Sequence, residues 1–93
     1  MHGNKLYVGN LKYSVTNEQL RELFSGYGSV TEVKRIEGRG FGFVEMSSQA
    51  EAERVRENLS GYNFKGRTLV IDKVRYLEWE DQGIIKVIEE EGN

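Results

Sequence analysis

The chain has 93 residues, which suits one domain, and its formal net charge of −2 gives no overall tendency to bind nucleic acid. It contains no cysteine, so disulfides and thiolate metal sites are excluded. No apolar run approaches the roughly 20 residues of a membrane span, and no secretory signal opens the chain. We therefore expect a soluble, intracellular protein, cytoplasmic or nuclear, without a membrane partner.

Charge is distributed unevenly along the chain. Residues 1–75 hold 12 Lys and Arg against 9 Asp and Glu, a net charge of +3, whereas residues 76–93 hold one Lys against 6 Asp and Glu, a net charge of −5. We accordingly expect three parts. Residues 1–4 are a disordered N-terminus or foreign to the domain, residues 5–75 are the domain, and residues 76–93 are an acidic, apolar C-terminal extension.

A strand and a helix are predicted first. Residues 5–11, KLYVGNL, alternate in polarity and end in Gly-Asn, which indicates a strand that enters a loop. Thr16 has the properties of a helix N-cap, and Gln19 follows at the spacing of a capping box. Apolar residues then repeat at helical spacing until Gly26 and Gly28, which predict the end of the helix.

Two strands follow this helix. Residues 29–37 predict a second strand, although Arg35 occupies a position where a core residue is expected. A short turn leads to a third strand at residues 40–46, GFGFVEM.

A second helix and a fourth strand complete the pattern. Ser48 and Glu51 again have capping-box spacing, and Gly61 predicts the C-terminal end of this helix. After a turn at residues 62–67, residues 68–74 predict the fourth strand. The order β-α-β-β-α-β is that of the ferredoxin-like α+β fold. Each helix has one apolar side, so both should pack on one face of the sheet and leave the other face open.

The third strand shows which residues face the helices. Side chains alternate along a strand, so one set of residues takes the helix side and the other takes the open side. We assign to the helix side Gly40, Gly42, Val44 and Met46. The two glycines would let a helix approach the sheet closely. Phe41 and Phe43 then point to the open face, as does Tyr7 on the first strand. Three exposed aromatic rings form a patch that suits the stacking of unpaired nucleobases.

The chain resembles the RNA recognition motif family over about residues 5–75. LYVGNL, residues 6–11, is similar to the family's hexamer on the first strand, and RGFGFVEM, residues 39–46, is similar to its octamer on the third. The resemblance implies a four-stranded antiparallel sheet whose first and third strands are central. It also implies that single-stranded RNA lies across this sheet.

Matched position by position, the resemblance implies roles for individual residues. Tyr7 is the stacking aromatic of the hexamer. Phe41 and Phe43 are the aromatics of the octamer, one for a base and one for the sugars. Arg39 opens the octamer, where a basic residue reaches a phosphate, and its planar fork suits that contact. Asn10 shapes the loop after the first strand.

Further cations near the open face are candidate RNA contacts. Lys5 and Lys34 fall on this face by alternation, and Lys73 and Arg75 lie near its edge. No nucleophile–base pair and no metal-ligand cluster can be assembled from the sequence, so we expect neither an enzyme nor a cofactor. Single-stranded DNA is a second candidate ligand.

The extension, residues 76–93, fits either a hairpin or a helix, and we favour the hairpin. Because it is acidic and apolar, it would fit over the basic, aromatic face and block RNA. It would alternatively bind a protein partner or form a homodimer. The competing function is therefore a protein-interaction module whose sheet is covered by this extension or by a partner peptide.

Overall fold

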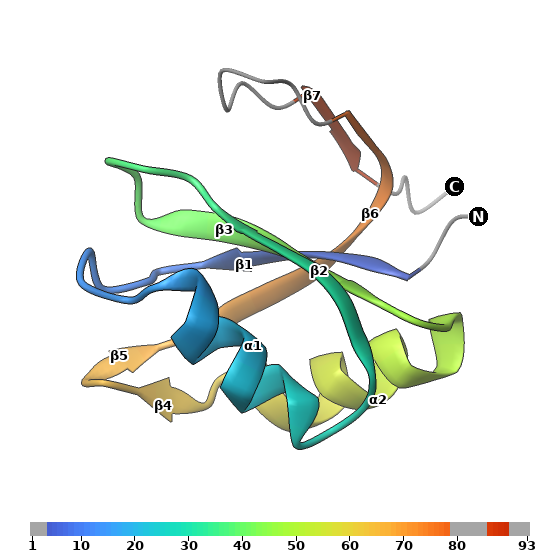
Figure 1. The fold of residues 1–93 in the computed structure, drawn as a ribbon, viewed down its shortest axis with the longest axis horizontal. Helices are drawn as coiled ribbons and strands as arrows, with labels where there is room; N and C mark the ends of the chain where they lie inside the picture. The colour runs from blue at the N-terminus through green and yellow to red at the C-terminus, as the bar shows by residue number, and fades with distance from the viewer. Residues whose placement is uncertain (1–3, 79–85, 90–93) are drawn as a thin grey trace.

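Two helices lie on one side of a β-sheet in the computed structural model, which describes residues 4–78 and 86–89 (Figure 1). The helices are α1 (Asn17–Ser25) and α2 (Gln49–Leu59). The strands are β1 (Lys5–Gly9), β2 (Val30–Arg35), β3 (Phe41–Met46), β4 (Asn63–Phe64), β5 (Arg67–Thr68), β6 (Val70–Glu78) and β7 (Lys86–Glu89).

The main sheet has the strand order β2-β3-β1-β6-β7, and every neighbouring pair is antiparallel. Its first four strands with the two helices form the ferredoxin-like α+β fold that the sequence predicted. β1 and β3 occupy central positions, also as predicted. β7 is an addition to this fold and pairs with the second half of β6.

The core lies between the sheet and the helices. Alternate apolar residues of β1, β3 and β6 point toward the helices, and each is at most 2% exposed. On the helix side, the apolar stripes of α1 and α2 are equally buried. The strand set is Leu6, Val8, Val44, Met46 and Ile71, and the helix set is Leu20, Phe24, Ala52, Val55 and Leu59. Burying these side chains supplies most of the favourable free energy of folding.

The two helix starts differ from each other. Thr16 and Gln19 form the predicted capping box, because the Thr16 hydroxyl accepts from the Gln19 amide and the Gln19 side chain accepts from the Thr16 amide, both at 3.1 Å. At α2 the prediction is only half right. The Ser48 hydroxyl accepts from the Glu51 amide at 3.2 Å, but the Glu51 carboxylate turns to the Ser29 amide at 2.8 Å.

The glycines of β3 serve a different contact from the one predicted. A Cβ atom at Gly42 would lie 2.8 Å from the Lys34 carbonyl oxygen and 2.9 Å from Arg35 Cα. Gly42 therefore permits the close approach of the β2 backbone and not of a helix. Gly40 has only ordinary contacts at 3.5 Å or more. The expected role of both glycines in helix–sheet approach was wrong.

A small hairpin, β4–β5, replaces the turn predicted at residues 62–67. Its two central residues, Lys65 and Gly66, have φ angles of 54° and 90°. Positive φ at both positions is the signature of the type I′ turn, which matches the twist of a two-residue hairpin. β6 then begins at Val70, two residues later than the predicted strand, and continues to Glu78.

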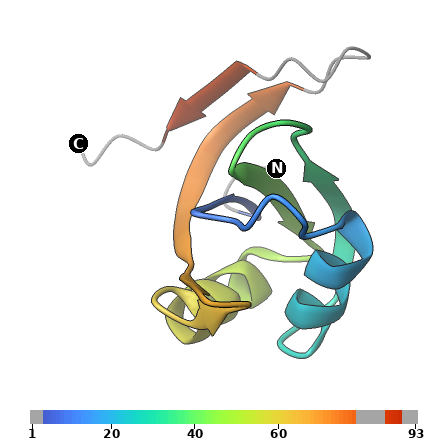
Figure 2. The same ribbon diagram turned by 90° about the vertical axis from the view of Figure 1, so that its left-hand side faces the viewer.

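The chain ends differ from the simple four-strand picture. Asn4 is 7% exposed, and its side-chain amide nitrogen donates to the Met46 carbonyl at 3.0 Å, so the packed part of the chain includes a residue just before the predicted domain. At the other end, β6 bends, and its second half with β7 lies on the side of the sheet away from the helices (Figures 1 and 2). The remainder of the predicted extension, and residues 1–3, lie outside the described residues.

Candidate nucleic-acid interface

Three aromatic rings gather on the face of the sheet opposite the helices. Tyr7 and Phe43 are Cα partners across β1 and β3, and Phe41 is the partner of Gly9. The Tyr7 and Phe41 rings are 5.6 Å apart at their centroids and only 28° from parallel. Phe43 meets both edge to face, at 5.9 Å from Tyr7 and 5.7 Å from Phe41. The predicted trio is therefore assembled, with all three rings in mutual contact.

The trio is not uniformly exposed, which corrects the expectation of three rings on an uncovered sheet. Tyr7 and Phe41 are partly exposed, but Phe43 is only 1% exposed. Both other rings pack on Phe43, and the second half of β6 with β7 lies on the same side of the sheet (Figure 2). Tyr7 and Phe41 are therefore the rings that a ligand can reach directly.

Gly9 determines how the Tyr7 ring lies. Both residues project from the same side of β1, two positions apart. A Cβ atom at Gly9 would lie 2.6 Å from Tyr7 Oη and 2.7 Å from one of its ring carbons. The ring thus lies along the strand, over the backbone of Gly9, and any larger residue would displace it. This positions one face of the phenol ring outward.

Three of the predicted basic residues lie on this face or at its rim. Lys5 Nζ is 3.5 Å from the carboxylate of Glu45, its cross-strand partner, so part of its charge is already balanced. Lys34 is the cross-strand partner of Phe43. Arg39 is exposed in the loop between β2 and β3.

Lys73 is on the wrong side for the role predicted from the sequence. Its Nζ is 3.2 Å from the Glu53 carboxylate of α2, and its cross-strand partner is the buried Leu6. Lys73 therefore points toward the helices, as the alternation along β6 requires once Asp72 faces the open side. The side chain of Arg75 lies outside the described part of the chain.

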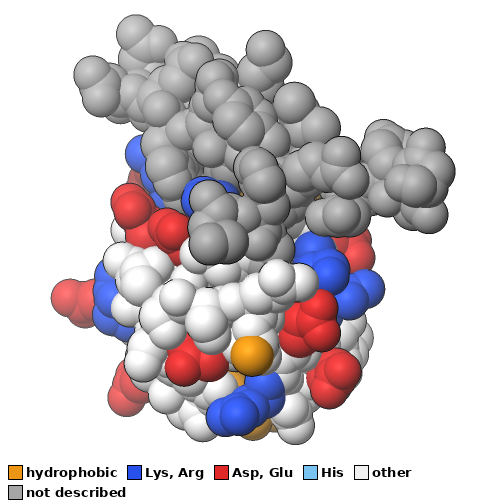
Figure 3. Space-filling view, turned by 90° about the vertical axis from the view of Figure 1, so that its right-hand side faces the viewer, with side chains coloured by type: hydrophobic (Ala, Val, Ile, Leu, Met, Phe, Trp, Pro, Cys, Tyr) orange, Lys and Arg blue, Asp and Glu red, His pale blue; other side chains and the backbone are white. Residues whose placement is uncertain are grey.

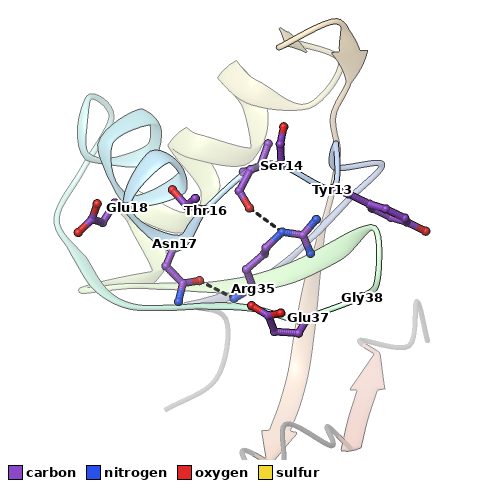
Figure 4. A pocket seen from close by; sticks show the side chains of 9 residues that line it. Tyr13, Ser14, Thr16, Asn17, Glu18, Arg35, Glu37 and Gly38 are labelled. Carbon is purple, nitrogen blue, oxygen red and sulfur yellow. Dashed lines mark hydrogen bonds between the residues drawn. The ribbon is translucent and has the colours of Figure 1, made fainter.

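Arg35 is a structural residue that sequence reasoning did not explain. Its Nε donates to the Val15 carbonyl at 2.7 Å and its Nη2 to the Lys12 carbonyl at 3.0 Å, both in the loop before α1. Its Nη1 donates to the Ile36 and Arg39 carbonyls in the β2–β3 loop. One guanidinium thus joins the two loops at this end of the sheet. It forms part of a surface pocket of about 420 Å³ (Figure 4).

Charges of both signs lie on the surface of the molecule. Lys and Arg side chains are interspersed with Asp and Glu on the side of the molecule shown in Figure 3.

Hydrogen bonds from the Ser47 hydroxyl and the Ser29 amide hold the pKa of Glu51 below its usual value of 4.5. Within residues 4–78 and 86–89, no group of three or more His, Cys, Asp or Glu is placed to hold a metal ion.

The geometry matches the family that the motifs suggested. A model of the RNA recognition motif family matches residues 6–70. The chain belongs to this family. A putative RNA-binding protein, RbpE of Nostoc, is 49% identical over 76 residues, which cover 75% of this chain and 77% of the relative. The 29 kDa chloroplastic ribonucleoprotein of Arabidopsis thaliana is 43% identical over 74 residues, which cover 73% of this chain but 22% of that protein.

Solved structures show the same fold. The second such domain of the yeast poly(U)-binding protein Pub1 superposes with a TM-score of 0.71 at 31% identity, over 80% of this chain and 96% of that one. The C. elegans NONO-1 homodimer matches with a TM-score of 0.68 at 35% identity, over 73% of this chain and 27% of that one. Neither helix in the described part of this chain is long and apolar enough to cross a membrane.

Proposed function

We propose that this domain is a single-stranded RNA-binding module in which bases stack on Tyr7 and Phe41. The observation that carries the proposal is the pair of partly exposed, nearly parallel rings on the sheet face away from the helices. Membership of the RNA recognition motif family supports RNA as the ligand. Neither the family match nor the names of the relatives favour the alternative of a module that only binds proteins.

The spacing of the rings favours an unpaired strand. Tyr7 and Phe41 have centroids 5.6 Å apart, and both project from the two central strands of the sheet, β1 and β3. Bases in a duplex are stacked on each other and cannot separate onto two rings, whereas bases in a single strand can. Base–aromatic stacking contributes about 1–3 kcal/mol per base. In this proposal Phe43 supports the other two rings from below.

Phosphate contacts add a smaller contribution. Arg39 is exposed at the rim and is proposed to hold a phosphate, with Lys5 and Lys34 beside the rings. Because the Lys5–Glu45 ion pair offsets one of these charges, the salt dependence of binding should be shallow. The proposal involves binding without chemistry, in an intracellular compartment. Single-stranded DNA as a ligand, and a protein partner or homodimer through residues 76–93, are further proposals.

The direct test is a titration of a fluorescently labelled random single-stranded RNA octamer, followed by anisotropy. Tyr7→Ala and Phe41→Ala should each weaken binding about tenfold or more, as the loss of one stacked base predicts. Tyr62→Ala is the matched control, because Tyr62 is 43% exposed but follows α2, away from this face. Variants at Tyr7 and Phe41 that bind like the parent would refute the proposal.

A further inference from the structure

The surroundings of the Tyr7 ring are asymmetric. On the β3 side, the neighbours of the ring are Phe41 and Phe43. On the β6 side, the cross-strand partner of Tyr7 is Asp72, and the partner of Gly9, over which the ring lies, is Val70. A base stacked on Tyr7 therefore has aromatic rings along one edge and a carboxylate along the other.

Asp72 is available for such a base. It is exposed, and no hydrogen bond or ion pair from the described residues engages its carboxylate. Directly opposed residues in an antiparallel pair have Cβ atoms about 4.5–5.5 Å apart, so Asp72 lies within reach of the edge of a base on Tyr7. Val70 beside it is 47% exposed and leaves the approach open.

The other carboxylates on this face are placed differently. Glu45 is engaged by Lys5 at 3.5 Å and by the Asn4 amide at 3.3 Å. Glu32 lies on β2, which β3 separates from the Tyr7 strand. Among the acidic side chains that the structure describes on this face, Asp72 is therefore the one positioned to select the base on Tyr7.

A carboxylate accepts hydrogen bonds and donates none at neutral pH. Guanine offers two adjacent donors on its Watson–Crick edge, N1–H and the N2 amino group, which match the two oxygens of a carboxylate. Adenine and cytosine offer one amino group beside a ring acceptor, and uracil offers one N–H between two carbonyl oxygens. The preference of such a site should follow the order guanine, then adenine and cytosine, then uracil.

We propose that Asp72 makes the Tyr7 position a guanine-selective subsite, reading the Watson–Crick edge of the base. This inference rests on the proposed function, because it requires a base stacked on Tyr7. It also assigns a cost to the same residue: the negative charge repels nearby phosphates when no donor edge compensates it.

The experiment compares two labelled octanucleotides, all-uridine and the same strand with one central guanosine, on the full chain. The parent should bind the guanosine strand at least fivefold more tightly than all-uridine RNA. Asp72→Asn should reduce this ratio below twofold, without weakening binding to all-uridine RNA. Glu57→Gln is the matched control, since Glu57 is an exposed carboxylate on α2, on the helix side of the sheet. It should leave the ratio unchanged.

Replacing the guanosine by inosine tests the edge that is read, because inosine lacks the N2 amino group. The parent should lose part of its preference for this strand, whereas Asp72→Asn should not respond. An Asp72→Asn variant that keeps the parent's guanosine preference overturns the inference, and so does a parent without any preference. Failure of the parent to bind either strand would instead refute the proposed function, and the inference with it.

Discussion

The two faces of the sheet are made of neighbouring residues in the same strands, yet they are built for opposite purposes. In β1, Leu6 and Val8 are fully buried against the helices, while Tyr7 between them lies partly exposed on the other face. The helix side is mainly aliphatic, with the ring of Phe24 buried in it and those of Tyr27 and Phe64 packed against it. The other side holds aromatic and charged groups. The helix side supplies most of the apolar burial that drives folding, whereas on the other side Phe43 is buried and the partly exposed Tyr7 and Phe41 are available to a ligand.

The largest expected effect comes from substituting adjacent residues of β1. Leu6→Ala removes a side chain with 0% exposure and should lower the free energy of unfolding by about 2–5 kcal/mol. Tyr7→Ala should have a much smaller effect on unfolding and should act mainly on RNA affinity. Urea denaturation of both variants measures the effect on stability, and RNA titration measures the effect on affinity. A Tyr7→Ala variant as unstable as Leu6→Ala would show that the two faces are not functionally distinct.

The second prediction concerns the segment that lies over the ligand face, the face of the sheet that carries Tyr7 and Phe41. A chain ending at residue 75 lacks β7 and the second half of β6, which lie on the side of the sheet away from the helices. If this segment competes with RNA, the shortened chain should bind single-stranded RNA more tightly than the full chain. Isothermal titration of both chains measures the difference. Equal affinity would refute the blocking role predicted from the acidity of residues 76–93.

A smaller effect is expected at Gly9, which affects the ligand face alone. Gly9→Ala places a methyl group where the Tyr7 ring lies, so the ring must tilt away from the strand. RNA binding should weaken by about 1 kcal/mol, the low end of the stacking range. Gly66→Ala is a useful contrast, because its φ of 90° strains any side chain but lies in the β4–β5 turn. That variant should lose stability while its folded fraction keeps RNA affinity.

The smallest expected effect is on the free energy of unfolding, comes from Glu51 on the helix side, and depends on pH. The pKa of Glu51 is lowered in the folded protein by hydrogen bonds from the Ser47 hydroxyl and the Ser29 amide. A lowered pKa means that the stabilisation is present above pH 4.5, the usual value, and is lost as the pH falls through the folded value. Glu51→Gln should therefore be less stable than the parent at pH 7, with a difference that shrinks in acid. Denaturation curves of both proteins at pH 7 and in acid measure this difference in the free energy of unfolding. A difference that does not change with pH would contradict the prediction.

Local patterns predicted the elements of this fold well. The Thr16–Gln19 capping box depends on residues three positions apart, so the sequence contains all of its information. The alternation along β3 likewise placed Phe41 and Phe43 on the correct face. Lys73 was instead assigned to the edge of the open face, although alternation along β6 opposes it to Asp72, and its ion pair with Glu53 puts it on the helix side.

Contacts between distant segments were the ones that sequence reasoning missed. Glu51 was expected to close a capping box, but Ser29, 22 residues away, offers a better-placed donor. The burial of Phe43 depends on its tertiary surroundings, and alternation along its own strand carries no information about those. Arg35 looked misplaced because its partners, four backbone carbonyls in two loops, leave no trace in side-chain patterns.

Arg35 has a consequence for protein engineering. Because its side chain holds both loops by their backbone oxygens, these four hydrogen bonds do not depend on which side chains Lys12, Ile36 and Arg39 carry. A graft that lengthens the β2–β3 loop to add recognition residues would pull two of these oxygens away from the guanidinium. A variant with a longer loop would therefore need new hydrogen-bond donors for these two carbonyl groups. Substitutions at constant loop length are the safer way to alter ligand preference.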